Sequence, residues 1–98
     1  MTATLTPEAS TILKAAAEGG GIVAYVVTFG GPSITAGGRE IIPHDADHRA
    51  QQSWIGGLED LQRYGYVRDR GRGELFDVTR EGYQRADQPR AGSGKPSA

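Results

Sequence analysis

Hydrophobic residues near the beginning of the chain recur with the spacing of an α-helix. The residues that share this face are Ala9, Ile12, Leu13, Ala16 and Ala17. Such spacing is typical of an amphipathic helix. Thr6-Pro7-Glu8 supplies a capping side chain, a proline suited to the first helical position and an acid at the positive end of the helix dipole. Gly19-Gly20-Gly21 then ends the predicted helix.

The next pattern is a series of short apolar runs separated by glycines, which predicts β-structure. Ile22–Phe29 is rich in Val, Ile, Tyr and Phe, as strands are. Ser33–Ala36 and Glu40–Ile42 are further predicted strands, with glycine turns between the runs. Pro43 ends the last of them, because proline lacks the N–H that a sheet ladder needs. We therefore expect a glycine-rich β-hairpin or meander.

A long helix is predicted next, at about residues 46–64, with Asp45 or Asp47 as its cap. Its buried stripe is predicted to be Ala50, Trp54, Leu58 and Leu61, with Ile55 alongside. We expect Trp54 to be a core anchor between the two long helices. Gly56-Gly57 lies inside this helix, where each glycine costs about 1 kcal/mol relative to alanine. Either a neighbouring segment approaches this surface closely or the pair is a tolerated weak spot, and the sequence leaves both open.

The chain after this helix predicts a β-hairpin with a basic turn. Gly65 has the position of a glycine that ends a helix. Residues 66–68 and Leu75–Val78 are predicted to pair across the arginine- and glycine-rich turn 69–74.

A short final helix and a tail complete the pattern. Thr79 is predicted to cap a helix of about Arg80–Ala86, with Tyr83 as its core anchor. Residues 87–98 are rich in Pro, Gly and Ser and hold no large apolar side chain, which predicts a disordered tail.

Residues 50–86 resemble the C-terminal half of bacterial winged-helix domains. That family combines a leucine-rich helix, a Gly-aromatic-Val strand, an Arg- and Gly-rich wing and a Val-Thr-x-x-Gly helix start. The matching positions are Leu58, Leu61, Gly65, Tyr66-Val67, Arg68 to Gly73, Phe76, Val78-Thr79 and Gly82. The resemblance implies a small bacterial or phage domain with an α+β, winged-helix-like fold. Its parts are an N-terminal helix, a glycine-rich β-hairpin or meander, a long helix, a wing hairpin and a short C-terminal helix, within a single domain of residues 1–86.

The first half of the chain departs from this family pattern. A helix-turn-helix reader of DNA needs a positioning helix directly before its recognition helix. Residues 22–42 occupy that place and have the pattern of β-structure. Winged-helix modules also serve as protein-interaction and dimerisation domains, so the resemblance leaves the kind of partner open.

Composition and charge narrow the functional classes. The chain has 98 residues, no cysteine and a net charge of −1, which allows one domain and excludes a disulfide framework. DNA-binding domains are usually basic, and here any electropositive face must come from the second half. No apolar run is long enough to span a membrane, and the chain start lacks the features of a signal peptide. We therefore expect a cytoplasmic protein.

The best candidates for nucleic-acid contact are Arg68, Arg70 and Arg72. Arginines spaced by two on a hairpin can face one side, and the glycines between them let the backbone approach phosphate. The alternative is an ordinary solvated hairpin turn, where charges and glycine are common.

The exposed side of the long helix offers a second group of candidates. Arg49, Gln51, Gln52 and Arg63 are the polar residues predicted to contact nucleic acid there. Arginine pairs with guanine or phosphate, and glutamine pairs with adenine. Glu59 and Asp60 lie on the same side and would repel a duplex, and mixed charge is also what solvent-facing helices usually show.

Catalytic and metal sites have little support in the sequence. His44 and His48 could share one helix face only if both were helical, and Pro43 places His44 before the helix. The chain offers no cysteine nucleophile, no serine in a nucleophile elbow and no phosphate-binding glycine motif. We therefore expect no enzyme, no metal and no cofactor.

These observations lead to a non-enzymatic, winged-helix-like binding module. The first interpretation is a transcription regulator that contacts nucleic acid through the arginine-rich wing and the start of the long helix. The alternative is a small protein-interaction domain, an adaptor or a phage or host-defence inhibitor, that binds a protein and not DNA. Either partner, and a homodimer, are open at this point.

Overall fold

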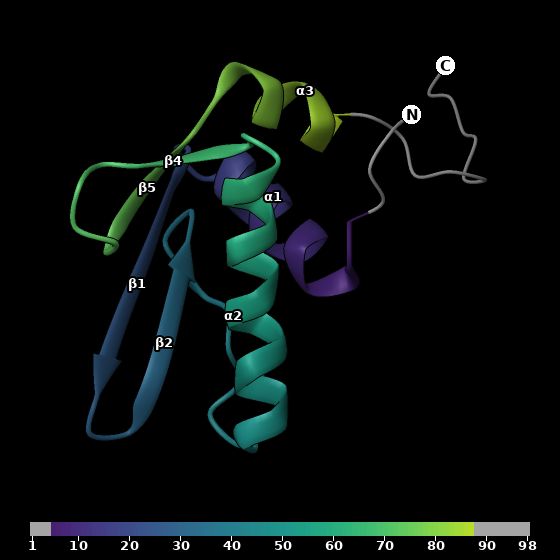
Figure 1. Ribbon diagram of the computed structural model, residues 1–98. Coiled ribbons are helices and arrows are strands. Elements are labelled where there is room, and N and C mark those ends of the chain that lie inside the picture. The colour runs from purple at the N-terminus through teal and green to yellow at the C-terminus, as the bar shows by residue number, and fades with distance from the viewer. Residues whose placement is uncertain (1–4, 88–98) are drawn as a thin grey trace.

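The computed structural model describes residues 5–87, which form an α+β fold with three helices and a five-stranded antiparallel sheet. In chain order the elements are α1 (Pro7–Glu18), β1 (Ile22–Thr28), β2 (Gly31–Ala36), β3 (Arg39–Glu40), α2 (His48–Arg63), β4 (Val67–Asp69), β5 (Leu75–Val78) and α3 (Arg80–Asp87). The strand order across the sheet is β3-β2-β1-β5-β4. Figure 1 shows the strands on one side of the molecule and the helices on the other.

The predicted helix caps are confirmed by hydrogen bonds. Thr6 caps α1, because its Oγ1 accepts a bond of 3.2 Å from the Ala9 N–H. Asp47, not Asp45, caps α2, and its Oδ1 lies 2.8 Å from the Ala50 N–H. Each side chain satisfies a backbone donor that has no partner within its own helix.

The end of α2 sets the direction in which the chain enters β4. Gly65 adopts a φ of +80°, as predicted for the residue that ends this helix. Its N–H donates to Gln62 O at 3.1 Å, and the Tyr66 N–H donates to Leu61 O at 2.9 Å. These two bonds form a Schellman motif, which satisfies the last carbonyls of the helix and turns the chain.

The core lies between the helices and one face of the sheet. Alternate strand residues point into it, so that Val23 of β1 pairs with Ala36 of β2 and with Phe76 of β5. The buried apolar side chains are Ala9, Ile12, Leu13, Ala15, Ala16, Val23, Ile34, Ala36, Ile42, Leu58, Leu61, Val67, Phe76 and Val78. The remaining strand residues point to the opposite face, because successive side chains of a strand alternate.

The two glycines inside α2 differ in their surroundings. A Cβ added at Gly57 would lie 2.8 Å from Ala9 N, so the beginning of α1 packs directly on this glycine. A Cβ at Gly56 would meet no atom within 4 Å. The close approach expected as one alternative therefore holds for Gly57, and Gly56 is the tolerated weak spot.

Two predicted anchors are placed differently from the expectation. The prediction of Tyr83 as a core anchor is wrong, because its side chain is 39% exposed and its hydroxyl lies over Gly21. The buried position of α3 is Gly82, where any Cβ would overlap the Tyr66 carbonyl oxygen. α3 thus lies too close to the start of β4 for a large inward side chain. Trp54 is half-buried and packs against the edge of the core.

Several boundaries differ by one or two residues from the predictions. The third strand is Arg39–Glu40 and not Glu40–Ile42. The Ile41 N–H still donates to Ile34 O at 2.7 Å, but the chain then leaves the sheet and the Ile42 side chain is buried in the core. α3 includes Asp87, the first residue of the predicted tail. The rest of that tail, residues 88–98, lies outside the described residues.

Candidate functional site

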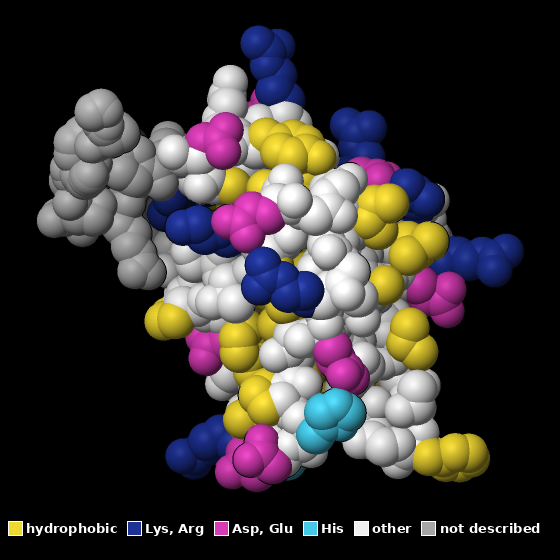
Figure 2. Space-filling view, turned by 180° about the vertical axis from the view of Figure 1, so that it is seen from behind, with side chains coloured by type: hydrophobic (Ala, Val, Ile, Leu, Met, Phe, Trp, Pro, Cys, Tyr) yellow, Lys and Arg dark blue, Asp and Glu magenta, His cyan; other side chains and the backbone are white. Residues whose placement is uncertain are grey.

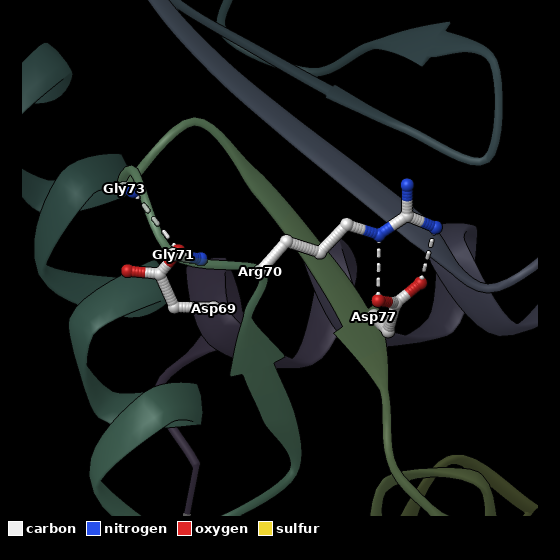
Figure 3. A network of polar contacts seen from close by, with 5 residues as sticks. All are labelled: Asp69, Arg70, Gly71, Gly73 and Asp77. Atoms are coloured by element: carbon white, nitrogen blue, oxygen red, sulfur yellow. Dashed lines mark hydrogen bonds and ion pairs between the residues drawn. The ribbon is translucent and has the colours of Figure 1, made fainter.

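The wing hairpin, formed by β4, β5 and the turn between them, is shaped by Asp69. Its Oδ1 accepts hydrogen bonds of 2.8 Å from the Gly71 N–H and 2.9 Å from the Gly73 N–H (Figure 3). These N–H donors, Gly71 first, hold the pKa of Asp69 below its ordinary value. Gly71 and Gly73 have φ values of +133° and +72°, which side chains other than glycine rarely adopt. Asp69 therefore holds the turn in its shape.

Arg70 is bound within the wing. Its Nε and Nη2 donate to the two carboxylate oxygens of Asp77, each at 2.8 Å (Figure 3). This fork-to-fork arrangement is the favoured geometry of an arginine–carboxylate pair. The Arg70 hydrogen bond is the main cause of the lowered pKa of Asp77, and the same pair raises the pKa of Arg70. One of the three arginines predicted to contact phosphate is thus paired with a carboxylate of the same face.

The other two wing arginines are accessible. Arg68 and Arg72 are exposed, and neither has an ion-pair partner within 4.0 Å among residues 5–87. Arg68 stands opposite Asp77 across the β4–β5 pair. Glu74 is exposed in the same turn. Within residues 5–87, the wing therefore has two cations without an ion-pair partner, in a neighbourhood of mixed charge.

The candidates on α2 lie in two groups. Arg49 and Gln52 are exposed in its first turns, whereas the Gln51 amide donates to Ala46 O at 3.2 Å and lies beside Gly31 of the β1–β2 hairpin. Arg63 is in the last turn, where its Nη1 lies 3.5 Å from Asp60 Oδ1. A helix of 16 residues is about 24 Å long.

The predicted nucleic-acid residues therefore do not form one surface patch. Figure 1 shows that the wing and the end of α2 lie toward one end of the molecule, and the start of α2 toward the other. An open groove of about 740 Å³ lies between the end of α2, the β4–β5 pair and the start of α3. Its charged lining is mixed and consists of Arg68, Asp69, Asp77, Arg80 and Glu81.

A second feature, which sequence reasoning missed, is the face of the sheet that points away from the helices. Ile22 and Leu75 are each 40% exposed on it, and Val26 is 49% exposed. The signal was present in the sequence, because β1 reads Ile-Val-Ala-Tyr-Val-Val and is apolar at successive positions. A strand with one solvated face normally alternates between apolar and polar residues.

The β1–β2 hairpin was predicted as β-structure, but sequence reasoning passed over its lack of charge, which is a third feature. Residues 19–38 contain no Asp, Glu, Lys, Arg or His. β1 pairs with β5 only over Ile22–Ala24, and the hairpin extends beyond that pairing. At its end Val27 is 65% exposed and Phe29 is fully exposed. Figure 2 shows hydrophobic side chains along this side of the molecule, with the outermost one at the end of the hairpin, lower right.

The remaining polar cluster considered from sequence is placed at the surface before α2. His44 Nε2 lies 3.0 Å from Glu40 Oε1, and both side chains are exposed. His48 is the first residue of α2. Across residues 5–87, no helix is long and apolar enough to cross a bilayer.

Comparisons with protein-family models, with curated proteins and with solved structures found no match for this chain. The wing, the open sheet face and the uncharged hairpin are therefore the features that bear on its function.

Proposed function

We propose that this chain is a non-enzymatic protein-binding module that docks on its partner through the β1–β2 hairpin. The observation that carries this proposal is the fully exposed Phe29 at the end of a hairpin without charged residues. Val27, two residues earlier, is also largely exposed. We call residues 27–32 the hairpin tip.

The chemistry of the hairpin tip favours a protein partner with an apolar pocket. Centres of protein–protein interfaces are depleted of charge and enriched in aromatic side chains. A single buried aromatic anchor often supplies much of the binding energy. A nucleic acid would instead require cations at the contact, and residues 19–38 provide none.

We further propose that residues 50–86 are a winged-helix-like half to which this hairpin has been added. The order α2, β4, wing, β5 and α3 supports that arrangement. Residues 19–47 are all described and contain no helix, so β2 and β3 occupy the place of a positioning helix. A recognition helix without its positioning helix is poorly suited to major-groove docking, which favours the hairpin over α2 as the contact element.

Nucleic-acid binding is the second candidate function, because Arg68 and Arg72 are exposed and unpaired within the described part of the chain. Phosphate contact needs only a few such cations. The net charge of −1, the Arg70–Asp77 pair and the separation of the α2 candidates from the wing all weigh against a large interface. This function stays a prediction.

A photo-crosslinking experiment tests the hairpin. Phe29 would be replaced by p-benzoylphenylalanine, and the variant irradiated in lysate of cells that encode the chain. We expect one discrete protein adduct, which excess wild-type chain suppresses and excess Phe29→Ala chain does not. The matched control carries the probe at Thr11, an exposed residue of α1. Identical adducts from both positions would contradict the proposal, as would no adduct at residue 29.

The dissociation constant for the purified partner then measures how much the Phe29 side chain contributes to binding. Loss of a central aromatic side chain costs about 2 kcal/mol or more, which is roughly a thirtyfold increase in the dissociation constant. We expect Phe29→Ala to show this loss while Thr11→Ala binds as the wild type does. Equal affinity of Phe29→Ala and wild type would exclude the hairpin tip as the contact.

A salt series with mixed DNA and RNA tests the second candidate. A nucleic-acid function predicts affinity that falls with salt and a shallower salt slope when Arg68 and Arg72 are both replaced by alanine. The slope should change by about one unit per lost phosphate contact. Absence of binding at low salt would exclude the nucleic-acid function, and protein binding would be the remaining proposal.

A further inference from the structure

We propose that the open face of the sheet pairs with the same face of a second copy, about a two-fold axis parallel to the strands. This surface is distinct from the end of the hairpin, because Val27 points to the opposite face and Phe29 lies in the turn. The inference therefore stands without the proposed docking of the hairpin tip.

One row of residues crosses the open face from one sheet edge to the other. Strand register places Glu40 of β3 beside Thr35 of β2, Thr35 beside Ala24 of β1, and Ala24 beside Leu75 of β5. Arg70 continues the row, because its N–H donates to Leu75 O at 2.9 Å. The row thus has an acid at one edge, small or apolar residues in the middle and a base at the other edge.

This row is complementary to itself when it is reversed. A two-fold axis that runs along β1 inverts the order of the strands and keeps the position along them. Glu40 of one copy then faces Arg70 of the other, Thr35 faces Leu75, and Ala24 faces Ala24. Two arginines, Arg68 and Arg70, and one acid, Asp77, lie at this edge of the open face. Asp77 balances the charge of Arg70, so the positive charge of Arg68 remains in excess at the β4 edge.

The other in-plane axis, perpendicular to the strands, would be unfavourable. It would set β3 on β3 and β4 on β4, so that the acidic edges and the basic edges each face their own kind. Like charges in direct opposition are destabilising, and opposite charges select the register of a pairing. Both axes give the aligned packing usual for two stacked sheets, so charge decides between them and favours the axis parallel to the strands.

The apolar residues of the face support a contact of modest size. Ile22 and Val26 lie on β1, under the axis, and would meet their own counterparts. Strands lie about 4.8 Å apart and rise about 3.3 Å per residue, so the face measures on the order of 24 by 15 Å. This area is below the roughly 800 Å² per partner of a standard interface, which predicts weak, concentration-dependent pairing.

Sedimentation equilibrium of the full chain at concentrations up to the millimolar range tests the pairing. We expect a reversible monomer–dimer equilibrium whose dissociation constant rises at least about tenfold in Leu75→Arg. Val27→Arg is the matched control, because it adds the same charge to an exposed apolar residue on the opposite face. Thermal melts by circular dichroism would check that both variants fold. A chain that stays monomeric throughout, or equal effects of the two variants, would overturn the proposal.

Cysteine crosslinking tests the axis, because the chain contains no cysteine of its own. With a short bismaleimide, Ala24→Cys should form covalent dimers, since this residue faces its counterpart on the axis. Thr35→Cys should crosslink weakly alone and efficiently when mixed with Leu75→Cys. Efficient crosslinking of Thr35→Cys with itself would show the perpendicular axis and refute the arrangement proposed here.

Discussion

Replacing each of the two adjacent glycines of α2 by alanine should affect the stability of the protein differently. Alanine favours a helix interior over glycine by about 1 kcal/mol, and both variants gain this amount. At Gly56 the added methyl group meets no atom within 4 Å, so the gain is kept in full. We therefore expect Gly56→Ala to stabilise the protein by about 1 kcal/mol, which raises the melting temperature by roughly 4–8 °C.

The same methyl group at Gly57 has to enter occupied space. It would lie 2.8 Å from Ala9 N and 3.1 Å from Glu8 C, both backbone atoms at the start of α1. These atoms cannot withdraw freely, because the Ala9 N–H is bound to the Thr6 cap at 3.2 Å. Overpacking of this kind costs about 1–3 kcal/mol. Gly57→Ala should therefore be less stable than Gly56→Ala by about 1–3 kcal/mol. Helix propensity does not contribute to this difference, because both variants gain it equally.

Urea unfolding followed by tryptophan fluorescence measures this difference. Trp54 is the single tryptophan of the chain and lies in the same helix as both glycines. With a slope of about 1 kcal/mol per molar urea, the midpoints of the two variants should differ by about 1 M or more. Equal stabilisation by both substitutions would refute the close packing of α1 on α2 and the reasoning built on it.

Three further predictions concern the core, the wing and the start of α3. Phe76→Ala removes a large side chain that is 2% exposed and should lower the free energy of unfolding by about 3–5 kcal/mol in urea titrations, whereas Phe76→Leu should lose much less. The lowered pKa of Asp77 favours its charged form in the folded protein, so its contribution to stability is present above the unfolded pKa of about 3.9 and is lost as the pH falls through the lower folded pKa. Thermal melts between about pH 5 and 2 should therefore show a smaller loss of stability in Asp77→Asn, and unchanged pH dependence would contradict a stabilising Arg70 pair. Thr79→Ala removes the acceptor of the Gly82 N–H, at 3.0 Å, and should cost about 1 kcal/mol by the same urea assay, whereas Thr79→Ser should retain most of that stability.

The local signals of the sequence predicted the elements well. Thr6, Asp47 and Gly65 each act through hydrogen bonds or dihedral angles within a few residues, and the structure has each of them at a helix end. Such interactions need no distant partner, which is why a sequence shows them. The glycine turns of the β-segment were identified for the same reason.

The roles of individual residues inside those elements were less predictable. Gly56 and Gly57 are adjacent in the same helix, and the position of α1 shows that a neighbouring backbone packs on Gly57 alone. Tyr83 has the spacing of a core residue, yet the close approach of α3 to Tyr66 gives the buried position to Gly82. Sequence periodicity indicates which face is apolar but contains no information on how near the neighbouring backbone lies.

The candidate surfaces show the same division. Composition and local propensity were enough to give the order of the elements, the basic turn and the absence of charge in residues 19–38. The three-dimensional arrangement was needed to show that Arg70 binds Asp77, that the start of α2 and the wing lie apart, and that Glu40 and Arg70 end one row across the open sheet face. These relations depend on strand register and helix placement, which are set by contacts between residues distant in the chain.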